Sequence, residues 1–189
     1  MAVVVGPVAL WAGLLVPVVI GFRRGRPRGL LSFRATDLLY GLALGLLLRT
    51  VQGWLAVAAG DDGALPSYST IDGQLSSLWL FTGLIAPVVV APLVEELLFR
   101  GVVLVSVHRI AQRGLEGGLL ALIASTASFV ALHAVSGITR WDEPVALAFV
   151  GIVCGVLVLS TGRIWGAVLV HLVFNGSYVV LALAGTLLG

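Results

Sequence analysis

The sequence predicts an all-α membrane protein, a polytopic transmembrane helix bundle with about six spanning helices. Apolar residues make up 59% of its 189 residues and charged residues only 11%, whereas soluble domains carry about a quarter charged residues. The mean hydropathy is +1.11. Apolar runs of about 20 residues, the length that crosses a bilayer, recur along the chain. Lipid offers the backbone no hydrogen-bond partner, so each run is expected to be helical.

Six segments have this length and composition. They are 3–22, 36–59, 78–105, 118–135, 144–160 and 164–187. No basic residue precedes the first segment, as one would in a secretory signal, so we expect a membrane helix there. The third segment is too long for one crossing, and we expect it to kink near Pro92 and to run past the membrane surface. No polar stretch is long enough for a soluble domain, so residues 1–189 are predicted to form a single membrane domain.

The positions of the arginines predict the orientation in the membrane. The first loop holds Arg23, Arg24, Arg26, Arg28 and Arg34, the third Arg109 and Arg113, the fourth Arg140 and the fifth Arg163, and the second has none. The positive-inside rule then places the odd loops in the cytoplasm and both termini outside, in a bacterial-type inner membrane. The formal net charge of +2 is too small to indicate a nucleic-acid partner, so we expect none.

Few ionisable side chains interrupt the apolar segments. An ionisable group inside a bilayer is costly, so it needs a partner or a function. These residues are Arg49, Glu95, Glu96, Arg100, His133 and His171, joined by the neutral Asn175. This short set carries the functional prediction.

The first motif is Glu-Glu-x-x-x-Arg at Glu95, Glu96 and Arg100. Glu96 and Arg100 are four residues apart on one helix face, which predicts an ion pair. Glu95 points about 100° away around the helix and is free for another role, such as that of a general base. The alternative is that both glutamates only take part in structural ion pairs.

Two further motifs are Phe-x-x-x-His at Phe129 and His133 and His-x-x-x-Asn at His171 and Asn175. Each places its two residues on one face of an apolar helix. Taken singly, they are also explained by a packed histidine and an interhelical hydrogen bond. A shared polar cavity between the third, fourth and sixth segments would satisfy all three motifs, and it would hold the parts of a water-activating hydrolytic site.

Residue counts along straight helices give the two histidines different depths. At 1.5 Å per residue, His171 lies about 12 Å and His133 about 22 Å from the cytoplasmic starts of their segments. Tilted helices or other helix ends are needed to bring the two side chains together.

The three motifs, complete and in this order, resemble those of the CPBP intramembrane proteases, also called the Abi or CAAX protease family. That family includes CAAX prenyl endopeptidases and bacteriocin-processing or immunity proteins. The resemblance covers about residues 84–178, which would form the catalytic core on the third, fourth and sixth helices. It implies hydrolysis of a peptide bond in a membrane-associated or prenylated, CAAX-like peptide or protein, in contact with the lipid bilayer.

The residue chemistry suggests a role for each side chain. Glu95 is the expected general base for the attacking water, and His133 helps to hold that water. His171 and Asn175 are expected to stabilise the oxyanion as hydrogen-bond donors. Arg100 is expected to orient Glu96 and to keep it ionised. The active site is expected towards the cytoplasmic side.

A metal-dependent mechanism uses the same residues. His133, His171 and Glu95 could supply the three protein ligands that a catalytic Zn²⁺ or another divalent metal needs. Asn175 is a poor zinc ligand, and adjacent glutamates point in different directions, so we prefer a metal-free glutamate mechanism.

Two non-protease functions are also compatible with a polar cavity. One is a bacteriocin-immunity or scaffold membrane protein without catalysis. The other is a transporter with glutamate proton carriers, which would have inverted repeats that this sequence lacks. Arg49, in the second segment, is expected to be a structural partner of Glu95 or Glu96, or to bind a substrate carboxylate.

Overall fold

The computed structural model describes residues 2–70, 72–112, 114–135 and 137–188, and these ranges contain helices and no strand. The elements are α1 (Ala2–Gly25), α2 (Ala35–Ala58), η1 (Leu80–Val90), α3 (Ala91–Leu98), η2 (Phe99–Leu104), α4 (Val105–Ile110), α5 (Gly114–Val135), α6 (Asp142–Thr161) and α7 (Trp165–Leu188). The α-helices α1, α2, α5, α6 and α7 are long and apolar enough to cross a membrane. The predicted all-α polytopic bundle is therefore confirmed.

The predicted third segment is a continuous helical run that consists of η1, α3, η2 and α4. Two π-helical stretches, η1 and η2, interrupt its α-helical pattern. With this run counted as one helix, the described residues form the six helices that the sequence predicts.

Pro92 accounts for the end of the first π-helical stretch. In a π-helix each carbonyl accepts from the residue five positions later, and the N–H of Ala91 donates to Ala86 in this way. The next such pair would join Pro87 to Pro92, but proline has no N–H to donate. The carbonyl of Pro87 therefore has no partner at this spacing, and the helix continues in the α-helical pattern from Ala91. The irregularity expected near Pro92 is thus a change of hydrogen-bond pattern.

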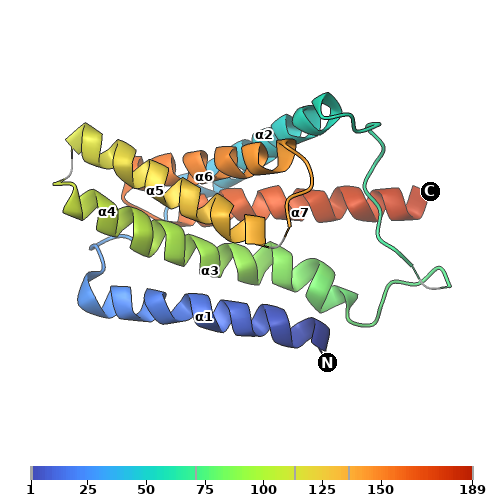
Figure 1. The fold of residues 1–189 in the computed structure, drawn as a ribbon, viewed down its shortest axis with the longest axis horizontal. Helices are drawn as coiled ribbons and strands as arrows, with labels where there is room; N and C mark the ends of the chain where they lie inside the picture. The colour runs from blue at the N-terminus through green and yellow to red at the C-terminus, as the bar shows by residue number, and fades with distance from the viewer. Residues whose placement is uncertain (1, 71, 113, 136, 189) are drawn as a thin grey trace.

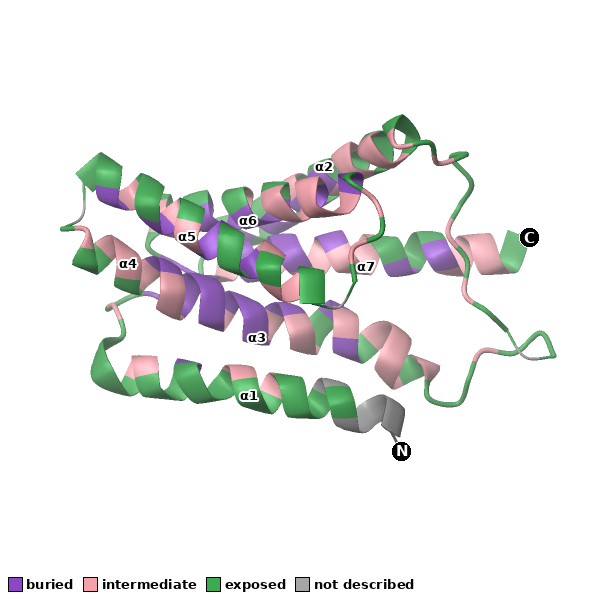
Figure 2. Cartoon of the chain, viewed as in Figure 1, coloured by how far each residue is buried: buried purple, intermediate pink, exposed green. Residues whose placement is uncertain are grey.

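The short helix α3 lies at the centre of the bundle. Most of its side chains are buried, whereas much of α1 is exposed, as an outer, lipid-facing helix would be (Figure 2). It contacts α1 and α7, while the adjoining η2 contacts α5 and α6. Side chains on α3 and η2 therefore face α5, which carries the second motif, and α7, which carries the third.

Glycines let two pairs of helices approach closely, as the Gly-x-x-x-Gly spacing suggests. A Cβ atom at Gly41 would collide with Leu169, and one at Gly45 would lie 2.7 Å from Cβ of Val173, so α2 packs tightly on α7. Gly151 and Gly155 bring α6 equally close to α5. These contacts hold α2 against α7 and α5 against α6 in the bundle that surrounds α3.

Successive helices run in opposite directions, so both termini lie at one end of the bundle (Figure 1). The loops that follow α1, α4 and α6 lie at the other end. These are the arginine-containing odd loops, so the structure gathers them at one end of the molecule, as the topology prediction requires. Arg113 itself lies outside the described residues.

We predict that Gly45→Leu destabilises the folded protein by about 1–3 kcal/mol, the usual cost of overpacking a filled contact. The new side chain would meet Val173 and the carbonyl oxygen of Val170, 2.9 Å from the Cβ position. Gly53→Leu on the same helix is the matched control, because open space surrounds Gly53. Thermal unfolding in detergent measures both variants, and equal midpoints would contradict tight α2–α7 packing.

Candidate active site

Glu96 and Arg100 form a fully buried ion pair. Oε1 of Glu96 lies 2.9 Å from Nη1 of Arg100, which confirms the predicted pairing across one helical turn. Nη2 of Arg100 also donates to the carbonyl oxygen of Gly151 at 3.2 Å, and the guanidinium lies 4.7 Å from the ring centroid of Phe129. Arg100 thus connects the central helix to α6 and α5.

His171 on α7 reaches the same carboxylate. Its Nδ1 lies 3.1 Å from Oε1 of Glu96. An ionised carboxylate can only accept, so Nδ1 carries the proton of this hydrogen bond. The other ring nitrogen, Nε2, lies 3.9 Å from Oε2 of Glu95. The imidazole is therefore held between the two adjacent glutamates.

His133 on α5 approaches Glu95 from another side. Its Nδ1 lies 3.0 Å from the carbonyl oxygen of Phe129, one turn earlier, and must donate to it. Its Nε2 lies 3.8 Å from Oε2 of Glu95. The His133 side chain is 30% exposed and that of Glu95 10%, so this part of the cluster is open to small molecules.

Oε2 of Glu95 therefore faces two Nε2 atoms, at 3.8 and 3.9 Å. These separations are too long for direct hydrogen bonds, and a water molecule can instead lie against all three atoms. The arrangement can hold a water molecule beside a carboxylate and two imidazoles.

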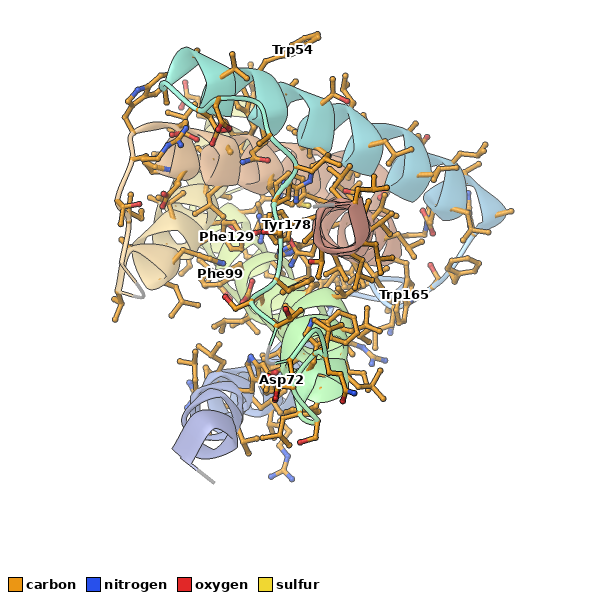
Figure 3. All side chains as sticks on the ribbon, turned by 90° about the vertical axis from the view of Figure 1, so that its right-hand side faces the viewer. Trp54, Asp72, Phe99, Phe129, Trp165 and Tyr178 are labelled. Carbon is orange, nitrogen blue, oxygen red and sulfur yellow. The ribbon has the colours of Figure 1, made fainter. Side chains whose placement is uncertain are left out.

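Phe129 forms the aromatic centre of the cluster. Its ring is fully buried, with centroid distances of 4.5 Å to His133 and 5.5 Å to both His171 and Phe99. Figure 3 shows Phe99 and Phe129 inside the bundle, whereas Trp54 points away from it. Sequence reasoning found Phe129 only through its spacing to His133 and missed Phe99, because no pattern in the sequence shows that these rings touch.

Asn175 does not reach the carboxylates directly. Its Nδ2 donates to the carbonyl oxygen of Pro87 at 2.8 Å. Pro92 has no N–H to donate to this Pro87 carbonyl, so the side chain of Asn175 takes the place of the missing backbone donor. This hydrogen bond connects α7 to η1. One N–H of the Asn175 amide remains for another acceptor. The structure thus brings five predicted site residues into one cluster and places the sixth, Asn175, beside it.

The possible metal ligands His133, His171 and Glu95 stay a prediction. Among the described residues, no three or more His, Cys, Asp or Glu side chains are arranged to hold a metal ion. Oε2 of Glu95 does face Nε2 of both His133 and His171, at 3.8 and 3.9 Å.

Arg49 also differs from expectation. Within the described residues it forms no ion pair with Glu95, Glu96 or another carboxylate. It donates instead to Phe174 O at 2.7 Å and to the side chains of Gln52 and Ser177.

A buried carboxylate–imidazole cluster inside a bundle of apolar helices defines an integral membrane protein with a polar site in its core. The family model described as Type II CAAX prenyl endopeptidase Rce1-like matches residues 77–177, more than half of the chain. The chain belongs to this family of proteases, which confirms the resemblance seen in the three motifs. Neither the curated proteins nor the solved structures that were searched gave a match.

Removing Arg100 should destabilise the fold, because the fully buried carboxylate of Glu96 loses its guanidinium partner. For Arg100→Gln we expect a loss of about 3–5 kcal/mol, the usual effect of breaking a buried pair. The double variant Glu96→Gln/Arg100→Gln, which removes both charges, should regain part of it. Unfolding midpoints in detergent compare the three proteins, and an unchanged midpoint for Arg100→Gln would refute this role.

Proposed function

We propose that the protein is an intramembrane endopeptidase that hydrolyses a peptide bond near the C-terminus of a membrane-associated, prenylated CAAX-like peptide or protein. The observation that carries the proposal is the position of Glu95, whose Oε2 faces Nε2 of both His133 and His171 in a largely buried site. The match to the CAAX prenyl endopeptidase family supports the substrate class.

The attacking water is held by Glu95 and His133. Nδ1 of His133 donates to the Phe129 carbonyl, so in the neutral ring Nε2 carries a lone pair. The water donates one hydrogen to this nitrogen and the other to Glu95. As the water oxygen attacks the scissile carbonyl carbon, Glu95 takes its proton, and it later delivers this proton to the leaving amine.

His171 stabilises the oxyanion formed by this attack. Its Nδ1 donates to Glu96, so donation from Nε2 as well requires a doubly protonated ring. Two carboxylates and one guanidinium leave the cluster with one excess negative charge, which a protonated His171 neutralises. The remaining N–H of Asn175 is the second donor to the oxyanion.

The same proposal places the end of the bundle with the first, third and fifth loops in the cytoplasm of a bacterial-type cell, following the positive-inside rule. His171 lies in the second turn of α7, counted from that end. This supports an active site that is reached from the cytoplasmic side.

Glu95→Gln should lower kcat for cleavage of a farnesylated CAAX peptide by about 10²–10⁴, the usual contribution of a general base. His171→Ala should lower it by about 10²–10³, the usual effect of losing an oxyanion donor. Peptide products are quantified by mass spectrometry with the purified protein in lipid vesicles.

Glu116→Gln is the control for these variants, because Glu116 is an exposed carboxylate at the start of α5. It should cleave like the wild type. Full activity of Glu95→Gln would exclude the mechanism. If the wild type cleaved no such peptide, the scaffold or immunity function would be favoured instead.

A further inference from the structure

Among the residues that the structure describes, no carboxylate pairs with the positive charge of Arg49. The three partners of its guanidinium are Phe174 O, Gln52 Oε1 and Ser177 Oγ, all neutral oxygens. Its Cζ lies 4.1 Å from the ring centroid of Phe174 and 5.3 Å from that of Tyr178. An arginine inside a membrane segment needs an anion or a function, and the described residues supply no anion.

The guanidinium keeps the donors that a carboxylate requires. Of its five N–H groups, three donate to these oxygens, through Nε, Nη1 and Nη2. One N–H therefore remains on each terminal nitrogen. Two parallel N–H donors match the two oxygens of a carboxylate.

An apolar groove of about 840 Å³ leads along the bundle to this guanidinium. It is formed by α2, η1 and α7, with Leu46, Leu84, Val173 and Leu181 among its apolar residues, and Arg49 is the single charged residue in its lining. The groove contains Leu172 and Gly176, the residues next to His171 and Asn175 in the chain. A ligand in this groove thus lies against the helix that carries the third motif.

A second cavity, of about 520 Å³, shares Arg49, Thr50 and Leu181 with the groove. It also contains Asp61, but this carboxylate is paired with Arg140 at 3.0 Å. Asp61 therefore does not pair with Arg49, and the charge of Arg49 is available to a ligand.

The depth of Arg49 favours a peptide end over a lipid headgroup. It is nine residues before the end of α2 at Ala58, about 13 Å along the helix, and about 21 Å from the start at Ala35. Lipid phosphates lie outside a hydrocarbon core of about 30 Å. An anion at the depth of Arg49 must be carried into the membrane on an apolar chain.

We infer that Arg49 binds the C-terminal carboxylate of the substrate, with the aliphatic residues that precede it lying in the groove between α2, η1 and α7. The inference rests on the proposed function and assigns its C-terminal specificity to one residue. A CAAX sequence has the matching chemistry, because two aliphatic residues precede a last residue with a free carboxylate.

The test compares two farnesylated peptides that differ only in a C-terminal carboxylate or carboxamide. The wild type should cleave the acid with a kcat/KM at least about tenfold higher, the range of a charge-assisted hydrogen bond. Arg49→Gln should cleave both peptides at the slower rate, and Arg49→Lys should keep part of the preference. Arg23→Gln, which removes an exposed arginine in the last turn of α1, is the control and should keep all of it. Because the preference is a ratio within one protein, a lower yield of folded variant does not affect it.

Binding separates this inference from the proposed function. Fluorescent versions of both peptides are titrated into Glu95→Gln protein, with and without Arg49→Gln. Tighter binding of the acid that disappears with Arg49 supports the inference even if no cleavage occurs. Equal binding and cleavage of acid and amide by the wild type, or a preference that survives Arg49→Gln, would overturn it. A response of the wild type to anionic lipid content that disappears in Arg49→Gln, without any acid preference, would identify a lipid site and also overturn it.

Discussion

The structure depends on how a low-dielectric bundle accommodates the carboxylate of Glu96. This fully buried group is paired with Arg100 and hydrogen-bonded to His171, and Arg100 in turn donates to Gly151 and lies over Phe129. The central helix, α5, α6 and α7 all contribute to this one network. An isolated charge would be strongly unfavourable here, so the network fixes how the four helices pack.

The same network sets the protonation states that the proposed chemistry uses. Glu96 requires a proton on Nδ1 of His171, and the Phe129 carbonyl requires one on Nδ1 of His133. Both rings therefore turn Nε2 towards Glu95. A hydrogen bond on the far nitrogen commonly orients a functional histidine in this way. The packing of the core and the geometry of the candidate site thus have one physical cause.

Much of this could be predicted from the sequence because helical periodicity is local. The apolar segments and the Glu96–Arg100 pair both follow from spacing along one helix. The partner of Asn175 could not be predicted, since it depends on a carbonyl that Pro92 leaves free on another helix. The contacts of Phe129 with His171 and Phe99 likewise join distant parts of the chain.

The depth difference between His133 and His171 shows a further limit of residue counting. His133 is near the end of α5, whereas His171 is near the start of α7, so straight helices with aligned ends would separate them. In Figure 1 α5 lies obliquely, and its C-terminal end lies short of the end that carries both termini. Helix tilt is set by packing against neighbours, which one sequence does not reveal.

Arg49 differs from the arginines of the bundle that form ion pairs. Arg100 is paired with Glu96, Arg163 with Asp37, and Arg140 with both Asp61 and Asp142. In each case the carboxylate comes from the same chain, and the pair joins turns, loops or helices of the bundle. Arg49 lies within α2, whereas Arg140 and Arg163 lie between helices, yet its partners in the described residues are neutral. Among the described residues, the chain thus pairs Arg100, Arg140 and Arg163 with its own carboxylates and leaves the charge of Arg49 for an anion that arrives with the substrate.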